Sequence, residues 1–321
     1  MSILIALLQL AAGFVLLMWS ADRLVSGASA LARNFGISTM VVGLVIVGFG
    51  TSAPEMVVSA LAALEGNPSL AIGNALGSNI ANVGLILGVT GLIFPMVVDR
   101  SSRRREFPIL GLATIGTAIL MINGSLSRID GLILISGLGL FLFIMIYRAL
   151  HRIKPDPSTV ALLAEIPDTM SNRAAIIWTL VGLIILPLSA HILVDGAVTM
   201  ATIMDVSEAV VGLTIVALGT SLPELAAAIA SAVKKEDDLC IGNILGSNLF
   251  NLMGVLGIAA LIHPMQIESM LIWRDLPVMA AIFAVLALMA YTSGRVTRSG
   301  AAFLLLCYFV YQIVVIYAAL V

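Results

Sequence analysis

Long apolar stretches separated by short polar segments run through almost the whole 321-residue chain, and they limit it to a membrane protein. Hydrophobic residues make up 60% of the sequence and charged residues only 11%, with a mean hydropathy of +1.13. Soluble domains carry roughly 45–50% apolar and about 25% charged residues. A helix crosses a hydrocarbon core of about 30 Å with roughly 20 apolar residues. By that measure we expect an all-α polytopic protein with ten transmembrane helices, at 3–32, 39–64, 70–94, 106–122, 129–149, 174–202, 208–233, 239–262, 275–291 and 300–319.

One longer polar segment interrupts this pattern. Residues 151–173 hold three prolines and charges of both signs, which is typical of a solvated linker. We therefore expect two domains of five helices each, 1–150 and 174–321, joined by this linker. The few charges fall in loops, and the sequence indicates no nucleic-acid partner, no cofactor and no obligatory protein partner. Membrane lipid is the expected surrounding.

Two motifs occur twice at a constant separation of 169 residues. The first is GTSAPE at 50–55 and GTSLPE at 219–224, and the second is GNALGSNIAN at 73–82 and GNILGSNLFN at 242–251. The same offset aligns Arg105 and Pro108 with Arg274 and Pro277, without a gap. Shared apolar composition gives scattered matches, but it does not keep Gly, Pro, Asn and Glu in register. We conclude that the two halves are copies.

Basic residues fall mainly on one side of the ten expected spans. The odd-numbered loops contain Arg33, Arg100, Arg103, Arg104, Arg105, Arg148, Arg152, Lys154, Arg173, Lys234, Lys235, Arg295 and Arg298, and the opposite side has only Arg128 and Arg274. By the positive-inside rule the first side is cytoplasmic. We therefore expect a multi-pass protein of the inner (plasma) membrane with a cytoplasmic linker and both termini outside. Five helices per half also invert the second copy, which is typical of alternating-access transporters.

Each copy of the first motif places a glutamate, Glu55 or Glu224, inside a long apolar run. A charged side chain at the middle of a membrane is costly, so it rarely lies there without a partner or a function. The proline before each glutamate cannot donate a helical hydrogen bond, and it clashes with the carbonyl four residues back. We therefore expect broken helices at spans two and seven. Each would offer a carboxylate, two hydroxyls and backbone oxygens, which are ligands of hard cations.

The second motif supplies polar partners on the neighbouring spans. Ser78 and Asn82 are four residues apart and share one helical face, and Asn74 lies one turn earlier. Glycines in the same segment permit close helix contact, so spans three and eight are expected to pack against the broken helices. Ser247 and Asn251 repeat the arrangement. Packing by small residues, or a protonated structural glutamate, is the simpler interpretation of either motif alone. The repetition of both motifs in register favours a cation site.

These motifs resemble the alpha repeats of the sodium/calcium exchanger family, within the cation/calcium exchanger superfamily. The resemblance covers nearly the whole chain and indicates a compact prokaryotic member. It implies exchange of Ca²⁺ for Na⁺ at one central site, with calcium held by Glu55, Glu224 and the backbone oxygens of Thr51 and Thr220. The implied sodium ligands are Ser52, Ser78, Asn82, Ser221, Ser247, Asn251 and the Ala217 carbonyl. Some members have an aspartate at the position of Asn251, which leaves the sodium count and any potassium dependence open.

Electrostatics favours exchange at such a site. Two neighbouring carboxylates in a low dielectric cannot both stay ionised without cations, and one Ca²⁺ or two Na⁺ neutralise them. A proton-coupled cation exchanger on the same scaffold is the main alternative, and a passive channel is another. We expect no enzyme, because H-E-x-x-H and G-x-S-x-G are absent and no histidine is expected near an acid at ligand spacing.

The first and sixth spans are the candidates for a moving part. They are long, and Gly27-Ala28 and Gly196-Ala197 give them thin surfaces. The family resemblance suggests that this pair slides across the rest of the protein. Asp22, His191 and Asp195 lie in or near these spans, and we interpret them as paired or interfacial groups rather than ion ligands.

Overall fold

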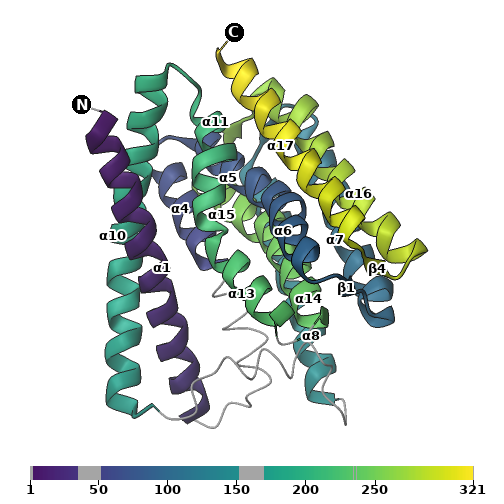
Figure 1. Ribbon diagram of the computed structural model, residues 1–321. Coiled ribbons are helices and arrows are strands. Elements are labelled where there is room, and N and C mark those ends of the chain that lie inside the picture. Colours follow the sequence, from purple (N-terminus) through teal and green to yellow (C-terminus); the bar gives the residue numbers. More distant parts are fainter. Residues whose placement is uncertain (1–2, 35–51, 152–169, 234, 236, 321) are drawn as a thin grey trace.

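Helices form nearly all the regular structure of the computed structural model, which describes residues 3–34, 52–151, 170–233, 235 and 237–320 (Figure 1). The first half contains α1 (Ile3–Asn34), α4 (Ala53–Leu64), α5 (Pro68–Ala81), the π-helical η2 (Asn82–Ile86), α6 (Leu87–Ile93), β1 (Met96–Val97), α7 (Arg100–Met121), β2 (Ser125–Leu126) and α8 (Arg128–His151). The second half contains α10 (Asn172–Met204), α11 (Glu208–Val211), η3 (Gly212–Val216), α12 (Ala217–Thr220), α13 (Leu222–Val233), α14 (Asp237–Leu249), η4 (Phe250–Val255), α15 (Leu256–Ile262), β3 (Met265–Gln266), η5 (Leu271–Asp275), α16 (Leu276–Thr292), β4 (Arg295–Val296) and α17 (Arg298–Leu320).

Eight helical stretches within the described residues are long and apolar enough to cross a membrane, and each coincides with one of the ten expected spans. Of the other two, the span expected at 39–64 is described only from residue 52. The span expected at 106–122 is α7, which begins at Arg100 and has several arginines in its first turns. The helical fold class is thus confirmed. The count of ten, the inversion of the halves and the side on which each end lies stay predictions.

Helices α1 and α10 lie side by side along most of their length (Figure 1). A Cβ at Gly13 would lie 2.8 Å from the Leu193 Cβ, and a Cβ at Gly182 would lie 2.6 Å from the Leu24 Cβ. The two contacts are equivalent under the repeat, because Gly182 is Gly13 shifted forward by 169 positions and Leu24 is Leu193 shifted back by 169. Glycine is therefore required at both of these close contacts, and the pair has an internal two-fold character.

Four two-residue strands were not foreseen from the sequence. Strand β1 pairs antiparallel with β4, and β2 pairs antiparallel with β3. Each pair joins a loop of the first half to a loop of the second, as β1 and β4 show at the lower right of Figure 1. Backbone groups outside the helices thereby obtain hydrogen-bond partners, and the two halves are tied together at both pairs.

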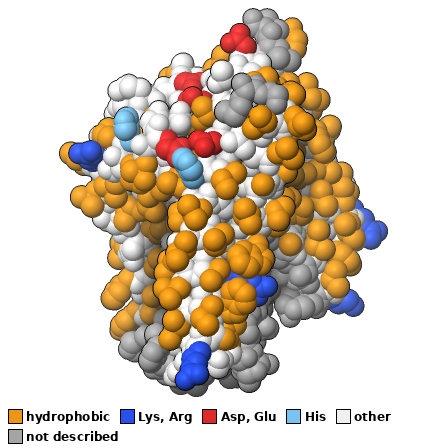
Figure 2. Space-filling view, turned by 90° about the vertical axis from the view of Figure 1, so that its left-hand side faces the viewer, with side chains coloured by type: hydrophobic (Ala, Val, Ile, Leu, Met, Phe, Trp, Pro, Cys, Tyr) orange, Lys and Arg blue, Asp and Glu red, His pale blue; other side chains and the backbone are white. Residues whose placement is uncertain are grey.

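The outer surface is apolar. Figure 2 shows hydrophobic side chains over most of the face that carries α1 and α10. Large apolar side chains are also strongly exposed on other helices, for example Leu112 at 70% and Ile129 at 71%. Such a surface is unstable in water and suits contact with lipid, so the structure agrees with the composition.

The centre of the protein is built from helices of both halves. Helix α5 packs against α4, and α13 packs against α14, as expected for broken helices beside the spans that follow them. The glycines of α5 have another neighbour than expected, however. A Cβ at Gly73 would lie 2.5 Å from the Ala209 carbonyl oxygen, and a Cβ at Gly77 would lie 2.7 Å from the Ala217 Cβ. The thin face of α5 therefore contacts the broken helix of the other half, and this brings the two motif copies together.

Candidate cation site

A new helix begins just before each glutamate. Helix α12 ends at Thr220 and α13 begins at Leu222, with Ser221 between them at φ −84° and ψ 6°. Ser52 has nearly the same conformation, φ −91° and ψ 3°, directly before α4. Proline in the first turn of the new helix lacks an N–H that would in any case have no intrahelical partner. The Pro-Glu sequence thus begins a helix at each site. The expected break is present in the second copy, and the part of the first span that precedes Ser52 lies outside the described residues.

All ten described residues of the predicted site are buried. Their exposed fractions are at most 3%, and they are Ser52, Glu55, Ser78, Asn82, Ala217, Thr220, Ser221, Glu224, Ser247 and Asn251. Thr51, the remaining predicted ligand, lies outside the described residues. Burial of so many polar groups in one region of an apolar protein requires hydrogen bonds or bound ions to offset their desolvation.

Contacts between predicted residues cross from one half to the other. The Ser221 hydroxyl donates to Glu55 Oε1 at 3.5 Å, and the two hydroxyl oxygens of Ser78 and Thr220 are 3.5 Å apart. The structure therefore brings the two motif copies into one polar centre.

Glu224 has a partner within its own half. The Ser247 hydroxyl donates to Glu224 Oε1 at 3.4 Å. The Ala217 carbonyl, predicted as a sodium ligand, accepts a hydrogen bond from the Ser221 N–H at 3.2 Å, and its oxygen lies 3.4 Å from the Thr220 hydroxyl oxygen. That carbonyl therefore stabilises the helix break in this structure.

Two buried residues outside the predicted set complete the network around Thr220. Asn74 Nδ2 donates to the Ser59 hydroxyl at 2.9 Å and to the Glu55 carbonyl at 3.4 Å, and the Thr220 hydroxyl donates to Asn74 Oδ1 at 3.2 Å. The sequence placed Asn74 on the polar face of its helix but gave it no role. Ser59 lies one helical turn after Glu55, and that spacing is the signal that could have found it.

Five predicted residues carry buried oxygen atoms without a hydrogen-bond partner among the described residues. These atoms are Ser52 Oγ, Glu55 Oε2, Asn82 Oδ1, Glu224 Oε2 and Asn251 Oδ1. Buried polar atoms in native proteins are nearly always paired, so such a group of exceptions requires an explanation. Carboxylate, amide and hydroxyl oxygens from both halves form the ligand type that Ca²⁺ and other hard cations bind.

The polar helices widen next to these residues. η2 begins at Asn82 itself, and Asn251 lies inside η4. A π-helical turn adds one residue to a helical turn and occurs often at functional sites. Nothing in the sequence pattern predicted these segments.

One expectation about the histidines was wrong. His191 Nδ1 lies 2.5 Å from Glu65 Oε1, and His191 Nε2 lies 3.7 Å from Asp195 Oδ2. His191 and Asp195 are one helical turn apart on α10, and Glu65 comes from the end of α4, which sequence spacing does not reveal. Acidic and histidine side chains gather in the upper part of the face in Figure 2. All three side chains are partly or largely exposed, so a paired role remains the interpretation.

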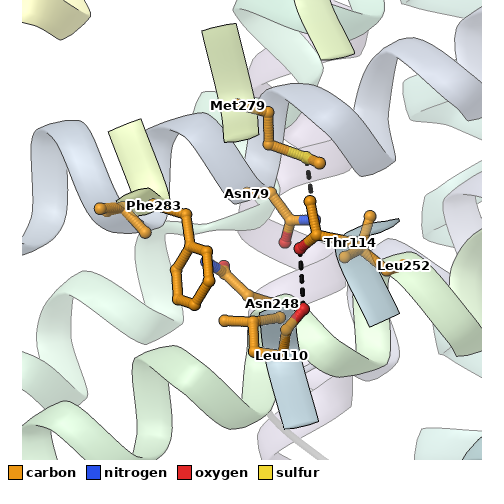
Figure 3. Close-up of a pocket in the computed structure, with 8 residues that line it drawn as sticks. Asn79, Leu110, Thr114, Asn248, Leu252, Met279 and Phe283 are labelled. Atoms are coloured by element: carbon orange, nitrogen blue, oxygen red, sulfur yellow. Dashed lines mark hydrogen bonds between the residues drawn. The ribbon is translucent and has the colours of Figure 1, made fainter. Parts of the chain in front are cut away.

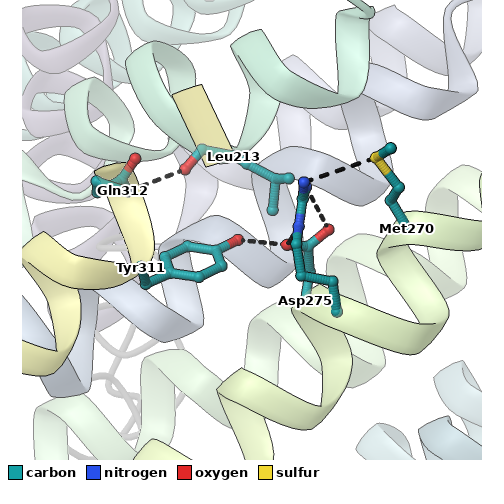
Figure 4. Close-up of polar contacts among 6 residues, drawn as sticks. Leu213, Met270, Asp275, Tyr311 and Gln312 are labelled. Atoms are coloured by element: carbon teal, nitrogen blue, oxygen red, sulfur yellow. Dashed lines mark hydrogen bonds and ion pairs between the residues drawn. The ribbon is translucent and has the colours of Figure 1, made fainter. Parts of the chain in front are cut away.

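Two further features of the interior lie outside the predicted set of residues. A pocket is lined by Asn79, Val83, Leu110, Thr114, Asn248, Leu252, Met279 and Phe283 (Figure 3). In Figure 4, the fully buried Asp275 accepts hydrogen bonds from the Arg274 guanidinium and, at 2.9 Å, from the Tyr311 hydroxyl. Asp275 is thus fully paired, whereas Asn79 is not.

A helical membrane protein with two buried carboxylates among oxygen ligands is typical of cation transporters, and comparison with known proteins narrows this class. The model of the family described as sodium/calcium exchanger protein matches residues 5–147 and 174–317. The chain is 39% identical over 316 residues to the inner membrane protein YrbG of Escherichia coli, covering 98% of this chain and 97% of that one. It is 28% identical to the sodium/calcium exchanger MaX1 of Methanosarcina acetivorans, covering 95% and 97%.

Comparison with solved structures points to the same family. The solved structure of the sodium-calcium exchanger NCX_Mj, soaked with 10 mM Na⁺ and 10 mM Sr²⁺, superposes with a TM-score of 0.66 at 29% identity, covering 96% of this chain and 98% of that one. The chain belongs to the sodium/calcium exchanger family. It is accordingly an integral membrane protein and an antiporter of the calcium-exchanger type.

Proposed function

We propose that this protein exchanges Ca²⁺ for Na⁺ by alternating access at one site formed by Glu55, Glu224 and the neighbouring hydroxyl and amide groups. The observation that supports this most directly is the set of five buried, unpartnered oxygen atoms. They belong to residues that the two motifs had singled out, and they come from both halves. A cation between the halves would give these atoms the partners that the described residues do not.

The charge of the site supports coupling between the two ions. Two carboxylates carry two negative charges, which one Ca²⁺ or two Na⁺ neutralise. A neutral complex crosses a low-dielectric barrier far more easily than a doubly charged empty site. Ca²⁺ and Na⁺ compete for the same oxygens, so binding of one ion displaces the other. This competition couples the movement of Ca²⁺ in one direction to the movement of Na⁺ in the opposite direction.

We further propose that α1 and α10 form the moving part. The two helices pack mainly on each other through glycines, and the hydroxyl oxygens of Ser20 and Ser189, 169 positions apart, approach to 3.5 Å. Phe14 of α1 also lies over Gly219, since a Cβ at that glycine would overlap the Phe14 ring. Gly219 directly precedes Thr220, so a shift of α1 would uncover one side of the site.

The test is uptake of ⁴⁵Ca²⁺ into proteoliposomes that contain the purified protein, with internal Na⁺ varied and with valinomycin present or absent. Uptake that rises with internal Na⁺, compared with protein-free liposomes, supports the proposal, and the valinomycin arm shows whether net charge moves. Uptake driven by a pH gradient and not by Na⁺ would instead support the proton-coupled alternative. Ca²⁺ flux without any counter-ion would indicate a channel.

A further inference from the structure

An amide pair joins the two halves next to the proposed site. Asn82 Nδ2 donates to Asn248 Oδ1 at 2.9 Å, and both side chains are buried. The two ends of an amide differ, because the nitrogen only donates and the oxygen only accepts. With its nitrogen engaged by Asn248, Asn82 has its oxygen left without a partner among the described residues. A hard cation binds that oxygen and not the nitrogen, so Asn248 determines which end of Asn82 is available to it.

The same pair exists 169 positions away, but its hydrogen bond is not made. Shifting Asn82 and Asn248 by this offset gives Asn251 and Asn79. Both polar atoms of Asn251 and the Asn79 Oδ1 are buried and have no hydrogen-bond partner among the described residues. Of two equivalent amide pairs, one is closed in this structure and the other is open.

The open pair is held only weakly in its present position. Asn79 Nδ2 donates to Met279 Sδ at 3.5 Å (Figure 3). A thioether is a weak acceptor, so this contact costs little to break. Asn79 and Asn248 line the same pocket. The residues needed to close the second pair are therefore present, buried and not committed to strong partners.

We propose that Asn248 and Asn79 are positioning residues that orient the amides of Asn82 and Asn251, and that the two amide pairs close in alternate conformations of the transporter. This inference rests on the proposed function. If the halves exchange their roles when the site opens to the other side, the Asn251–Asn79 pair closes as the Asn82–Asn248 pair opens. Each conformation then presents one fixed amide oxygen to the ion.

A double-mutant cycle on Asn82 and Asn248 tests the positioning role, with Ca²⁺ binding to the purified protein measured by titration calorimetry. We expect Asn248→Ala to weaken Ca²⁺ binding by about 10- to 100-fold, the usual effect of losing a group that orients a metal ligand. In an Asn82→Ala background the same change should alter the affinity by no more than about twofold. If the two effects multiply instead, Asn248 does not act through Asn82 and the proposal is overturned.

Controls separate this role from general destabilisation. Thr117→Val removes a buried hydroxyl outside the site, also unpartnered among the described residues, and should leave Ca²⁺ affinity unchanged. Asn248→Leu removes the acceptor at similar volume, and it gives a second measurement if the alanine variant does not fold. Absence of Na⁺-driven flux in the wild-type protein would defeat the proposed function, whereas a multiplicative cycle with intact flux would defeat only this inference.

A variant of Asn79 tests whether the two amide pairs close in alternate conformations. Asn79→Ala removes a hydrogen bond that forms only in the other conformation, and one such bond is worth about 0.5–1.5 kcal/mol, or roughly two- to tenfold. We therefore expect a maximal ⁴⁵Ca²⁺ uptake rate lower by that factor, with a Ca²⁺ half-saturation concentration changed far less. A maximal rate equal to that of Thr117→Val would show that the second pair never closes.

Discussion

Replacement of Glu224 by glutamine is the most direct perturbation of the proposed site. Glu224→Gln keeps the size of the side chain and one oxygen, and it removes one negative charge. Glu224 is 1% exposed, with Oε1 accepting from Ser247 and Oε2 without a described partner. The substitution therefore leaves packing nearly unchanged, and its effect reports on the charge.

The expected magnitude follows from Coulomb's law. Ca²⁺ lies about 2.4 Å from a ligand oxygen. The double charge of the ion and a carboxylate charge at that separation attract by about 14 kcal/mol at an effective dielectric constant of about 20. At about 1.4 kcal/mol for each factor of ten, the loss corresponds to roughly a 10¹⁰-fold weaker interaction. Even if half of this interaction energy is offset by the lower desolvation cost of the amide, Ca²⁺ binding becomes too weak for transport.

The assay is Na⁺-driven ⁴⁵Ca²⁺ uptake in proteoliposomes that contain equal amounts of folded protein, as judged by size-exclusion chromatography. Glu224→Gln and Glu55→Gln should each reduce uptake to the level of protein-free liposomes. The matched control is Glu208→Gln, a partly exposed carboxylate at the start of α11, in the same apolar stretch as Glu224, which should transport normally. Near-normal uptake by both site variants would refute the assignment of these glutamates to the cation site.

The other predictions concern packing, a buried charge and pH. Gly182→Val should lower the melting temperature, because even its Cβ would lie 2.6 Å from that of Leu24 and overpacking costs about 1–3 kcal/mol; Gly116→Val, with no neighbour within 4 Å of its Cβ, should change it little. Asp275→Asn leaves the Arg274 guanidinium without its buried partner and should destabilise by about 3–5 kcal/mol in thermal or denaturant unfolding, and a stability equal to wild type would exclude a structural role for the pair. Protons compete with Ca²⁺ for the two site carboxylates, so ⁴⁵Ca²⁺ uptake should fall as the pH is lowered from about 8 to about 5, and a flat profile would argue against carboxylate ligands.

Local features of the site followed from the sequence because they depend on residues that are close along the chain. A proline before Glu224 fixes where α13 begins, and a spacing of four residues places Ser78 and Asn82 on one face. The hydrogen-bond partners of these residues could not be predicted from the sequence. Asn248, which receives the Asn82 hydrogen bond, is 166 positions away, and Glu65, which contacts His191, is 126 positions away. Helical periodicity says nothing about such pairs.

By itself, the sequence determined that this is a helical membrane protein, that it is a duplication at an offset of 169 residues, and which residue types surround the two glutamates. Those properties are encoded in composition, register and local spacing. Only the tertiary structure decided that α5 places its glycines against the other half, that Ser221 of one half donates to Glu55 of the other, and that one amide pair is closed while its equivalent is open. The physical reason is that two closely similar local motifs become different once packing gives each of them different neighbours.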